Sequence, residues 1–87
     1  MADTTGRVVT VRYYAAAAEA AGRQEEDVRL TAAATVGDLK AYLAATYGPA
    51  MTRVLASASF LADARISRDD ARALGQTVDV LPPFAGG

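Results

Sequence analysis

The chain has 87 residues, of which 52% are hydrophobic and 22% are charged, and its formal net charge is −1. This length fits one small domain, in which folding buries roughly 60% of the unfolded surface and leaves little room for a deep, lidded pocket. The near-neutral charge, with Lys40 as the single lysine, argues against nucleic acid as a main partner, and the absence of cysteine and histidine excludes disulfides, thiolate nucleophiles, ordinary zinc sites and imidazole catalysis.

Residues 1–6 are small and polar, and we expect them to form a disordered N-terminus. This segment lacks the basic region and the apolar stretch that mark a signal peptide. No window of about 18 residues is apolar throughout, so no membrane span is predicted. We therefore expect a cytoplasmic protein with no membrane partner.

Residues 8–14 are rich in β-branched and aromatic side chains, which predicts a first strand. Its alternation places three side chains on one dry face: Val9, Val11 and Tyr13. Arg12 and Tyr14 lie on the other face, either as simple solvent-facing residues or as part of a docking surface.

Residues 15–21 are alanine-rich and favour a short helix that Gly22 ends, although the alanine run also fits plain compositional bias. Residues 25–30 predict a second strand with Val28 and Leu30 pointing inward. The first two strands are therefore expected to form an antiparallel pair that the short helix bridges.

The clearest helix start lies at Thr35, where Asp38 three residues later completes a capping box. An apolar stripe follows at helical spacing: Val36, Leu39, Leu43 and Tyr47. Gly48 and Pro49 then predict the end of this helix.

The remaining pattern predicts strands over residues 58–62, 64–66 and 77–81, with a polar turn at residues 68–71. The expected fold is a single α+β domain over residues 7–81, in which one main helix packs across a mixed sheet. The first and last strands are separated by most of the chain, so they can lie parallel and adjacent at the sheet centre.

Residues 82–87 follow the last strand as a tail of Pro82, Pro83, Phe84, Ala85, Gly86 and Gly87. Proline is stiff and lacks a backbone donor, whereas glycine adopts almost any backbone conformation. A tail of this kind leaves the fold in a set direction and ends thin and flexible, so another protein's active site can admit it. We interpret the C-terminal carboxylate of Gly87 as the working group, although an ordinary frayed end has the same form. Phe84 either anchors a partner or folds back onto the core.

The ending Val80-Leu81-Pro82-Pro83-Phe84-Ala85-Gly86-Gly87 resembles that of the MoaD-type small subunits of molybdopterin synthase, within the MoaD/ThiS family of ubiquitin-like sulfur carriers. The opening Tyr13-Tyr14-Ala15 and the helix start at Thr35 fit the same family, and the resemblance covers about residues 7–87. Departures occur at Ala18, at Ala62 and at residues 74–77, and none touches the tail. The resemblance implies a β-grasp, ubiquitin-like fold.

The resemblance also implies a function without catalytic residues or a bound cofactor in this chain. A ubiquitin-activating-like adenylyltransferase and sulfurtransferase would consume ATP to adenylate Gly87, and a sulfur donor would then leave a thiocarboxylate. Gly86 would let the tail enter narrow channels, and the large, MoaE-type subunit of molybdopterin synthase would use the sulfur. The expected partner contacts are Leu81, Pro82, Pro83, Phe84 and Ala85.

Two alternatives stay open on the sequence. One is a carrier of the same chemistry that serves another pathway, such as cysteine, thiamine or secondary-metabolite sulfur. The other hypothesis is a ubiquitin-like protein modifier that forms isopeptide bonds.

Overall fold

The computed structural model of the protein describes residues 6–62 and 65–83. In these residues the elements are β1 (Gly6–Tyr13), α1 (Ala16–Ala21), β2 (Glu25–Thr31), α2 (Val36–Tyr47), α3 (Pro49–Leu55), β3 (Ser59–Ala62), β4 (Arg65–Ser67) and β5 (Thr77–Leu81). The strands form one five-stranded mixed sheet in the order β2-β1-β5-β3-β4. The predicted α+β architecture is confirmed.

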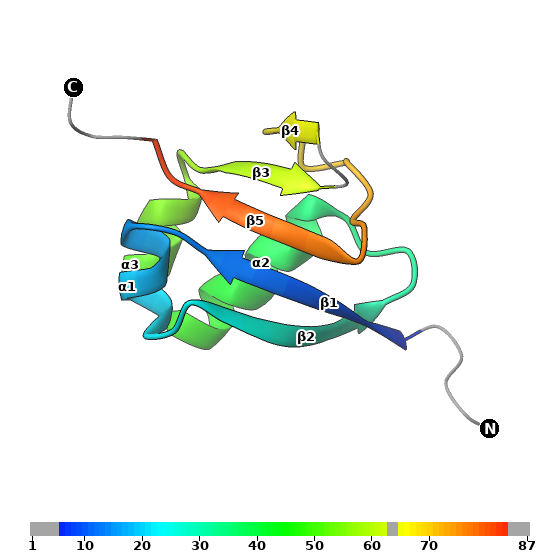
Figure 1. The fold of residues 1–87 in the computed structure, drawn as a ribbon, viewed down its shortest axis with the longest axis horizontal. Helices are drawn as coiled ribbons and strands as arrows, with labels where there is room; N and C mark the ends of the chain where they lie inside the picture. The colour runs from blue at the N-terminus through cyan, green and yellow to red at the C-terminus, as the bar shows by residue number, and fades with distance from the viewer. Residues whose placement is uncertain (1–5, 63–64, 84–87) are drawn as a thin grey trace.

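The first and last strands lie side by side at the sheet centre, as predicted (Figure 1). They run parallel, and Tyr13 of β1 is level with Val80 of β5. On either side the pairing is antiparallel, β1 with β2 and β5 with β3. The predicted pair of β1 and β2, joined through α1, is therefore also confirmed.

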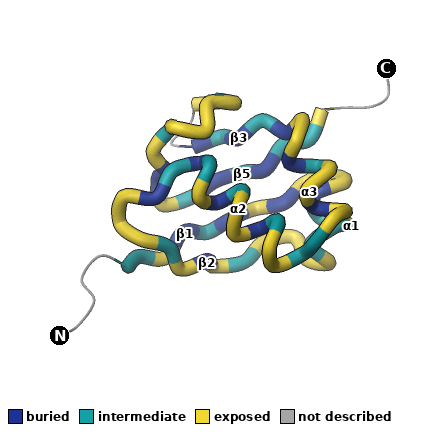
Figure 2. The backbone as a smooth tube through the Cα atoms, turned by 180° about the vertical axis from the view of Figure 1, so that it is seen from behind, coloured by how far each residue is buried: buried dark blue, intermediate teal, exposed yellow. Residues whose placement is uncertain are grey.

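One face of the sheet carries the core, because alternate side chains of each strand point toward the helices. Val9, Val11 and Tyr13 of β1 are buried, as their alternation predicts. Helices α2 and α3 lie over this face (Figure 2), and α1 lies at the end of the sheet beyond β1 (Figure 1), so three helices rather than the one main helix that we predicted enclose the core. Phe60 of β3 is the largest fully buried side chain. Its burial contributes roughly 1.5–3 kcal/mol.

The longest helix, α2, begins as predicted. The Thr35 backbone N–H donates to Asp38 Oδ2 at 2.9 Å, and the Asp38 N–H donates to Thr35 Oγ1 at 3.3 Å, which together form a capping box. Gly48 then breaks the helix at a φ of 85°, a conformation that favours glycine. The predicted end of the helix at Gly48 is confirmed.

The structure differs from the predictions in several places, including shifts of one residue at the ends of β1, β2 and β4. Strand β1 begins at Gly6, which we had assigned to a disordered N-terminus; its carbonyl and amide lie in the ladder opposite Thr31. Helix α3 was not predicted, although Met51 and Leu55 are buried at helical spacing and Pro49 occupies its first turn. Strand β3 begins one residue later than expected, at Ser59.

Candidate functional site

The base of the tail lies at the end of the central strands. Because β1 and β5 are parallel, both finish at this end of the sheet, and α1 begins beside them (Figure 1). Leu81 and Pro82 are half-buried and Pro83 is exposed. The core therefore holds the chain up to Pro82. The other predicted site residues, Phe84, Ala85, Gly86 and Gly87, lie outside the described residues.

No helix covers the sheet face on which Leu81 lies (Figure 1). Asp79 precedes Leu81 on this face, and the antiparallel register places Leu61 beside Asp79 and Ile66 beside Leu61. Ile66 is 66% exposed, and Tyr14, just beyond the end of β1, is 43% exposed. Apolar and aromatic surface therefore extends across the uncovered face from the base of the tail.

Charges also gather on the uncovered face. Arg12 of β1 lies between Glu25 of β2 and Asp79 of β5, and Arg12 Nε is 3.8 Å from Asp79 Oδ1. A partly exposed ion pair of this length contributes about 0–1 kcal/mol. Asp79 Oδ1 is buried and accepts no hydrogen bond from residues 6–62 and 65–83. A buried carboxylate oxygen of this kind needs a hydrogen-bond donor, which water or a docked molecule can supply.

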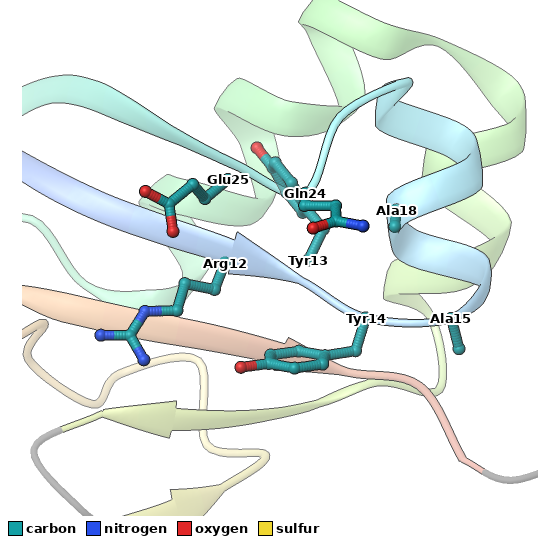
Figure 3. Close-up of a pocket in the computed structure, with 7 residues that line it drawn as sticks. All are labelled: Arg12, Tyr13, Tyr14, Ala15, Ala18, Gln24 and Glu25. Atoms are coloured by element: carbon teal, nitrogen blue, oxygen red, sulfur yellow. The ribbon is translucent and has the colours of Figure 1, made fainter.

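A cavity of about 350 Å³ opens at the end of β1. Its walls include Arg12 and Tyr14, Ala18 of α1, and Gln24 beside the start of β2. Figure 3 shows that these side chains come from the end of β1, from α1 and from the turn before β2. The cavity is shallow, and its aromatic and polar side chains suit contact with another molecule.

Ala15 makes the turn from β1 into α1 in a strained conformation. Its φ of 53° and ψ of −126° are uncommon for a residue with a Cβ. Strain of this kind costs about 1–3 kcal/mol and persists only where the surroundings impose it. Tyr13 before it and Ala17 after it are both buried in the core, which fixes the turn between them.

Two tyrosines share one carboxylate on the helix side of the sheet, near this end of β1. The hydroxyls of Tyr13 and Tyr47 both donate to Glu26 Oε2, while Arg23 Nη1 is 3.3 Å from Glu26 Oε1. The two rings meet edge to face, with their centroids 6.3 Å apart. Burial, and next the hydrogen bond to Glu26, raises the pKa of Tyr13 well above its usual value, and the same two causes raise the pKa of Tyr47. This network ties β1, β2 and α2 together.

The described part of the chain contains neither a metal-binding cluster nor a membrane-spanning helix. No group of three or more histidine, cysteine, aspartate or glutamate residues in it can hold a metal ion. None of its helices has both the length and the apolar character needed to cross a membrane.

Some features of the site were missed from the sequence. The backbone strain at Ala15 has no signal in an alanine-rich stretch. The sharing of Glu26 by Tyr13 and Tyr47 depends on tertiary contacts. Arg12 lies beside Asp79 because β1 and β5 pair in parallel. The sequence predicts the pairing of these strands but not their register, so it does not predict this contact.

Comparisons with known proteins place these observations in a family context. A model of the ThiS family matches residues 11–87. No curated protein matches the chain. Among solved structures, the chain is similar to the HVO 2177 protein of Haloferax volcanii, with 26% identity and a TM-score of 0.78 over 100% of this chain and 92% of that one.

The crystal structure of SAMP1 from Haloferax volcanii is similar at 25% identity and a TM-score of 0.77, over 93% of this chain and 100% of that one. A putative molybdopterin converting factor, subunit 1, from Pyrococcus furiosus has 21% identity and a TM-score of 0.70, over 88% of this chain and 98% of that one. At that identity the last likeness shows the fold alone. The expected ubiquitin-like β-grasp fold is confirmed.

Proposed function

The chain belongs to the ThiS family, and from this premise we propose that it is a sulfur carrier that acts through the C-terminal carboxylate of Gly87. In this proposal Gly87 is adenylated, converted to a thiocarboxylate, and used as the sulfur donor for molybdopterin biosynthesis. The chain would serve as the small, non-catalytic subunit of molybdopterin synthase, and the catalytic residues would lie on its partners.

The observation that carries this proposal is the position of the last strand. β5 lies at the centre of the sheet between β1 and β3, and it leads directly into Pro82 and Pro83. Two stiff residues after an anchored strand limit the directions in which the tail leaves. The match to the ThiS family extends through Gly87, so it includes the tail. These two facts support a tail that the fold presents to other proteins.

The proposed chemistry begins with activation of the carboxylate. A terminal carboxyl has a pKa of roughly 3.3–3.7, so at neutral pH it is ionised and a poor electrophile. Transfer of AMP from ATP to Gly87 releases pyrophosphate and makes the carbonyl reactive. A sulfur donor then displaces AMP and leaves the thiocarboxylate. Because the first step consumes ATP, we place the protein in the cytoplasm, and ATP binds to the activating enzyme rather than to this chain.

The partner contacts are proposed along the tail and its base. Leu81, Pro82, Pro83, Phe84 and Ala85 would contact first the adenylyltransferase and sulfurtransferase, and then a large, MoaE-type subunit. The proline pair lowers the entropy that the tail loses on binding. Gly86 keeps the approach to the reacting carbonyl narrow. The half-buried Leu81 and the apolar residues beside it give such partners a surface next to the tail.

Activation is tested by incubating the protein with a ubiquitin-activating-like enzyme and labelled ATP, and by comparing the full chain with a variant that lacks Gly87. We expect AMP transfer to the full chain alone, with identical circular dichroism spectra for both proteins. AMP transfer to the shortened chain would refute the role of Gly87. The acceptor is tested separately: the thiocarboxylate form is mixed with a large subunit and the pyranopterin precursor, and the absence of a dithiolene product would end the molybdopterin assignment.

The likeness to SAMP1, a small archaeal modifier protein, favours a second candidate function. A protein modifier would use the same activated Gly87 to form isopeptide bonds with lysines of other proteins. Immunoblots of the native host separate the two functions, because a modifier gives a ladder of conjugates and a dedicated carrier gives the free chain. A carrier for another sulfur pathway remains the alternative if the dithiolene assay fails while the thiocarboxylate forms.

A further inference from the structure

Strand β2 forms one edge of the sheet, and it is long and regular for an edge strand (Figure 1). All seven residues of Glu25–Thr31 pair with β1 in an unbroken antiparallel register, and none of them is proline or glycine. The opposite edge strand, β4, has only three residues. Short length, prolines, bulges and charged side chains are the usual protection of a sheet edge. Strand β2 has only the charges, and those on its uncovered face are of both signs, at Glu25, Asp27 and Arg29, so they can pair with each other in a second copy.

The hydrogen-bonding direction of each β2 residue follows from one bond. The Tyr13 N–H donates to the Gln24 carbonyl at 2.8 Å, so Gln24 directs its backbone groups toward β1. In an antiparallel ladder this direction alternates along the strand. The outward-directed backbone groups therefore belong to four residues: Glu25, Asp27, Arg29 and Thr31.

We propose that this edge pairs with β2 of a second copy of the chain, antiparallel, about a two-fold axis that passes beside Val28. Val28 is the middle residue of β2, so this is the one register in which all seven residues of both strands overlap. Asp27 then lies opposite Arg29 of the second copy, and the symmetry repeats this pair. Glu25 lies opposite Thr31 of the second copy. Every outward N–H and carbonyl of β2 finds a partner.

Strand overlap and charge together favour this register over its neighbours. If the axis moves by one residue in either direction, only five residues of each strand overlap. With the axis beside Asp27, Glu25 still faces Arg29, but Asp27 faces Asp27 of the second copy. With the axis beside Arg29, Arg29 faces Arg29. Like charges directly opposite each other destabilise a strand pair, whereas opposite charges stabilise it. If the axis moves by half a residue, each residue with outward-directed backbone groups lies opposite a residue of the second copy whose backbone groups point toward its own β1. No hydrogen bonds can then form between the two strands. The proposed register is thus the one that satisfies both the backbone and the charges.

The side chains around the pair fit this arrangement. Asp27 and Arg29 are both exposed and lie on the uncovered face of the sheet. Thr10 Oγ1 donates to Asp27 Oδ1 at 2.9 Å, which orients the carboxylate and leaves Oδ2 for Arg29 of the second copy. Leu30 is half-buried on the helix side, and the second copy would cover it further.

The assembly is expected to be weak and to leave the tails accessible. One pair of edge strands buries less than the roughly 1,200–2,000 Å² of a stable interface, so the dimer depends on protein concentration. The two-fold axis is perpendicular to the sheet and reverses the direction of each β5. The two tails therefore leave from opposite ends of the joined sheet. The proposal does not depend on the chemistry of Gly87.

The test is a charge exchange followed by sedimentation velocity of the full chain from micromolar to millimolar concentration. Asp27→Arg alone, and Arg29→Asp alone, each place like charges opposite each other twice in the dimer, and each should raise the dissociation constant about tenfold or more. An equimolar mixture of the two variants restores opposite charges at both positions. We expect that mixture to form a heterodimer about as tightly as the unaltered chain pairs with itself.

The recovery in the mixture also shows that both variants are folded. The matched control is Arg68→Asp, which changes the net charge as Arg29→Asp does but lies in the loop after β4, across the sheet from β2. This control should dimerise like the unaltered chain. The proposal fails if the unaltered chain stays monomeric at millimolar concentration, if either single variant dimerises normally, if the mixture shows no gain, or if the control loses the dimer.

Discussion

Tyr13 of β1 and Val80 of β5 lie at the same level of the two parallel central strands, and both side chains are buried. Phe60 of β3 pairs with Val80 from the other side. Strands β1 and β3 therefore hold β5 from both sides as far as Val80, the residue before Leu81. The buried core thus anchors the last strand, from which Pro82 follows.

Replacement of the largest buried side chain tests the dependence of the fold on this central layer. Phe60→Ala should lower the free energy of unfolding by about 3–5 kcal/mol, since it removes apolar contacts and leaves a cavity beside Val80. Urea denaturation followed by circular dichroism measures the change. Ile66→Ala is the control, because Ile66 is 66% exposed, and it should change the stability by less than about 0.5 kcal/mol.

Relief of the strained turn should stabilise the protein. Ala15→Gly removes the Cβ that makes a φ of 53° and a ψ of −126° unfavourable. We expect the free energy of unfolding to rise by about 1 kcal/mol, as measured by thermal and urea denaturation. A loss of stability would instead mean that the flexibility of glycine in the unfolded chain outweighs the strain.

The buried tyrosine network predicts how stability depends on alkaline pH. The pKa of Tyr13 is raised in the folded protein, so above about pH 10 the unfolded chain releases a proton that the folded chain keeps. Stability is therefore complete below about pH 10 and falls as the pH rises beyond it. Tyr13→Phe should reduce this fall by up to about 1.4 kcal/mol per pH unit. Urea denaturation across alkaline pH measures the slope, and equal slopes in both proteins would contradict the assignment.

The narrow end of the tail is tested by adding bulk to it. Gly86→Val should leave the melting temperature unchanged and should slow AMP transfer to Gly87 about 100-fold, because a displaced carbonyl loses the geometry of attack. Pyrophosphate release in the presence of the activating enzyme measures the rate. Ala45→Val, on the exposed face of α2, is the matched control and should transfer AMP at the normal rate.

Much of the fold was predictable because its signals are local. The alternation of Val9, Val11 and Tyr13 gave the buried face of β1, and the spacing of Thr35 and Asp38 gave the start of α2. These patterns depend on neighbours within one element, where the period of a strand or the geometry of a cap decides the outcome.

The features that escaped prediction depend on tertiary contacts. Helix α3 has seven residues, too short for a clear period, and packing of Met51 and Leu55 stabilises it. The turn at Ala15 is imposed by the burial of residues on both sides. The tail motif is a continuous stretch of sequence, so it could be recognised directly. Arg12 and Asp79, the charges beside the base of the tail, come from two separate strands and meet only in the folded sheet.

The central claim is that the carboxylate of Gly87 carries sulfur, and intact mass spectrometry of the protein purified from its native host tests it most directly. The account predicts a fraction of the chain heavier by the exchange of one oxygen for one sulfur, with fragmentation placing that sulfur at Gly87. This fraction should disappear in cells that lack the activating enzyme. A chain that shows only the unmodified mass in cells that are using sulfur carriers, or a sulfur located anywhere else, would contradict it.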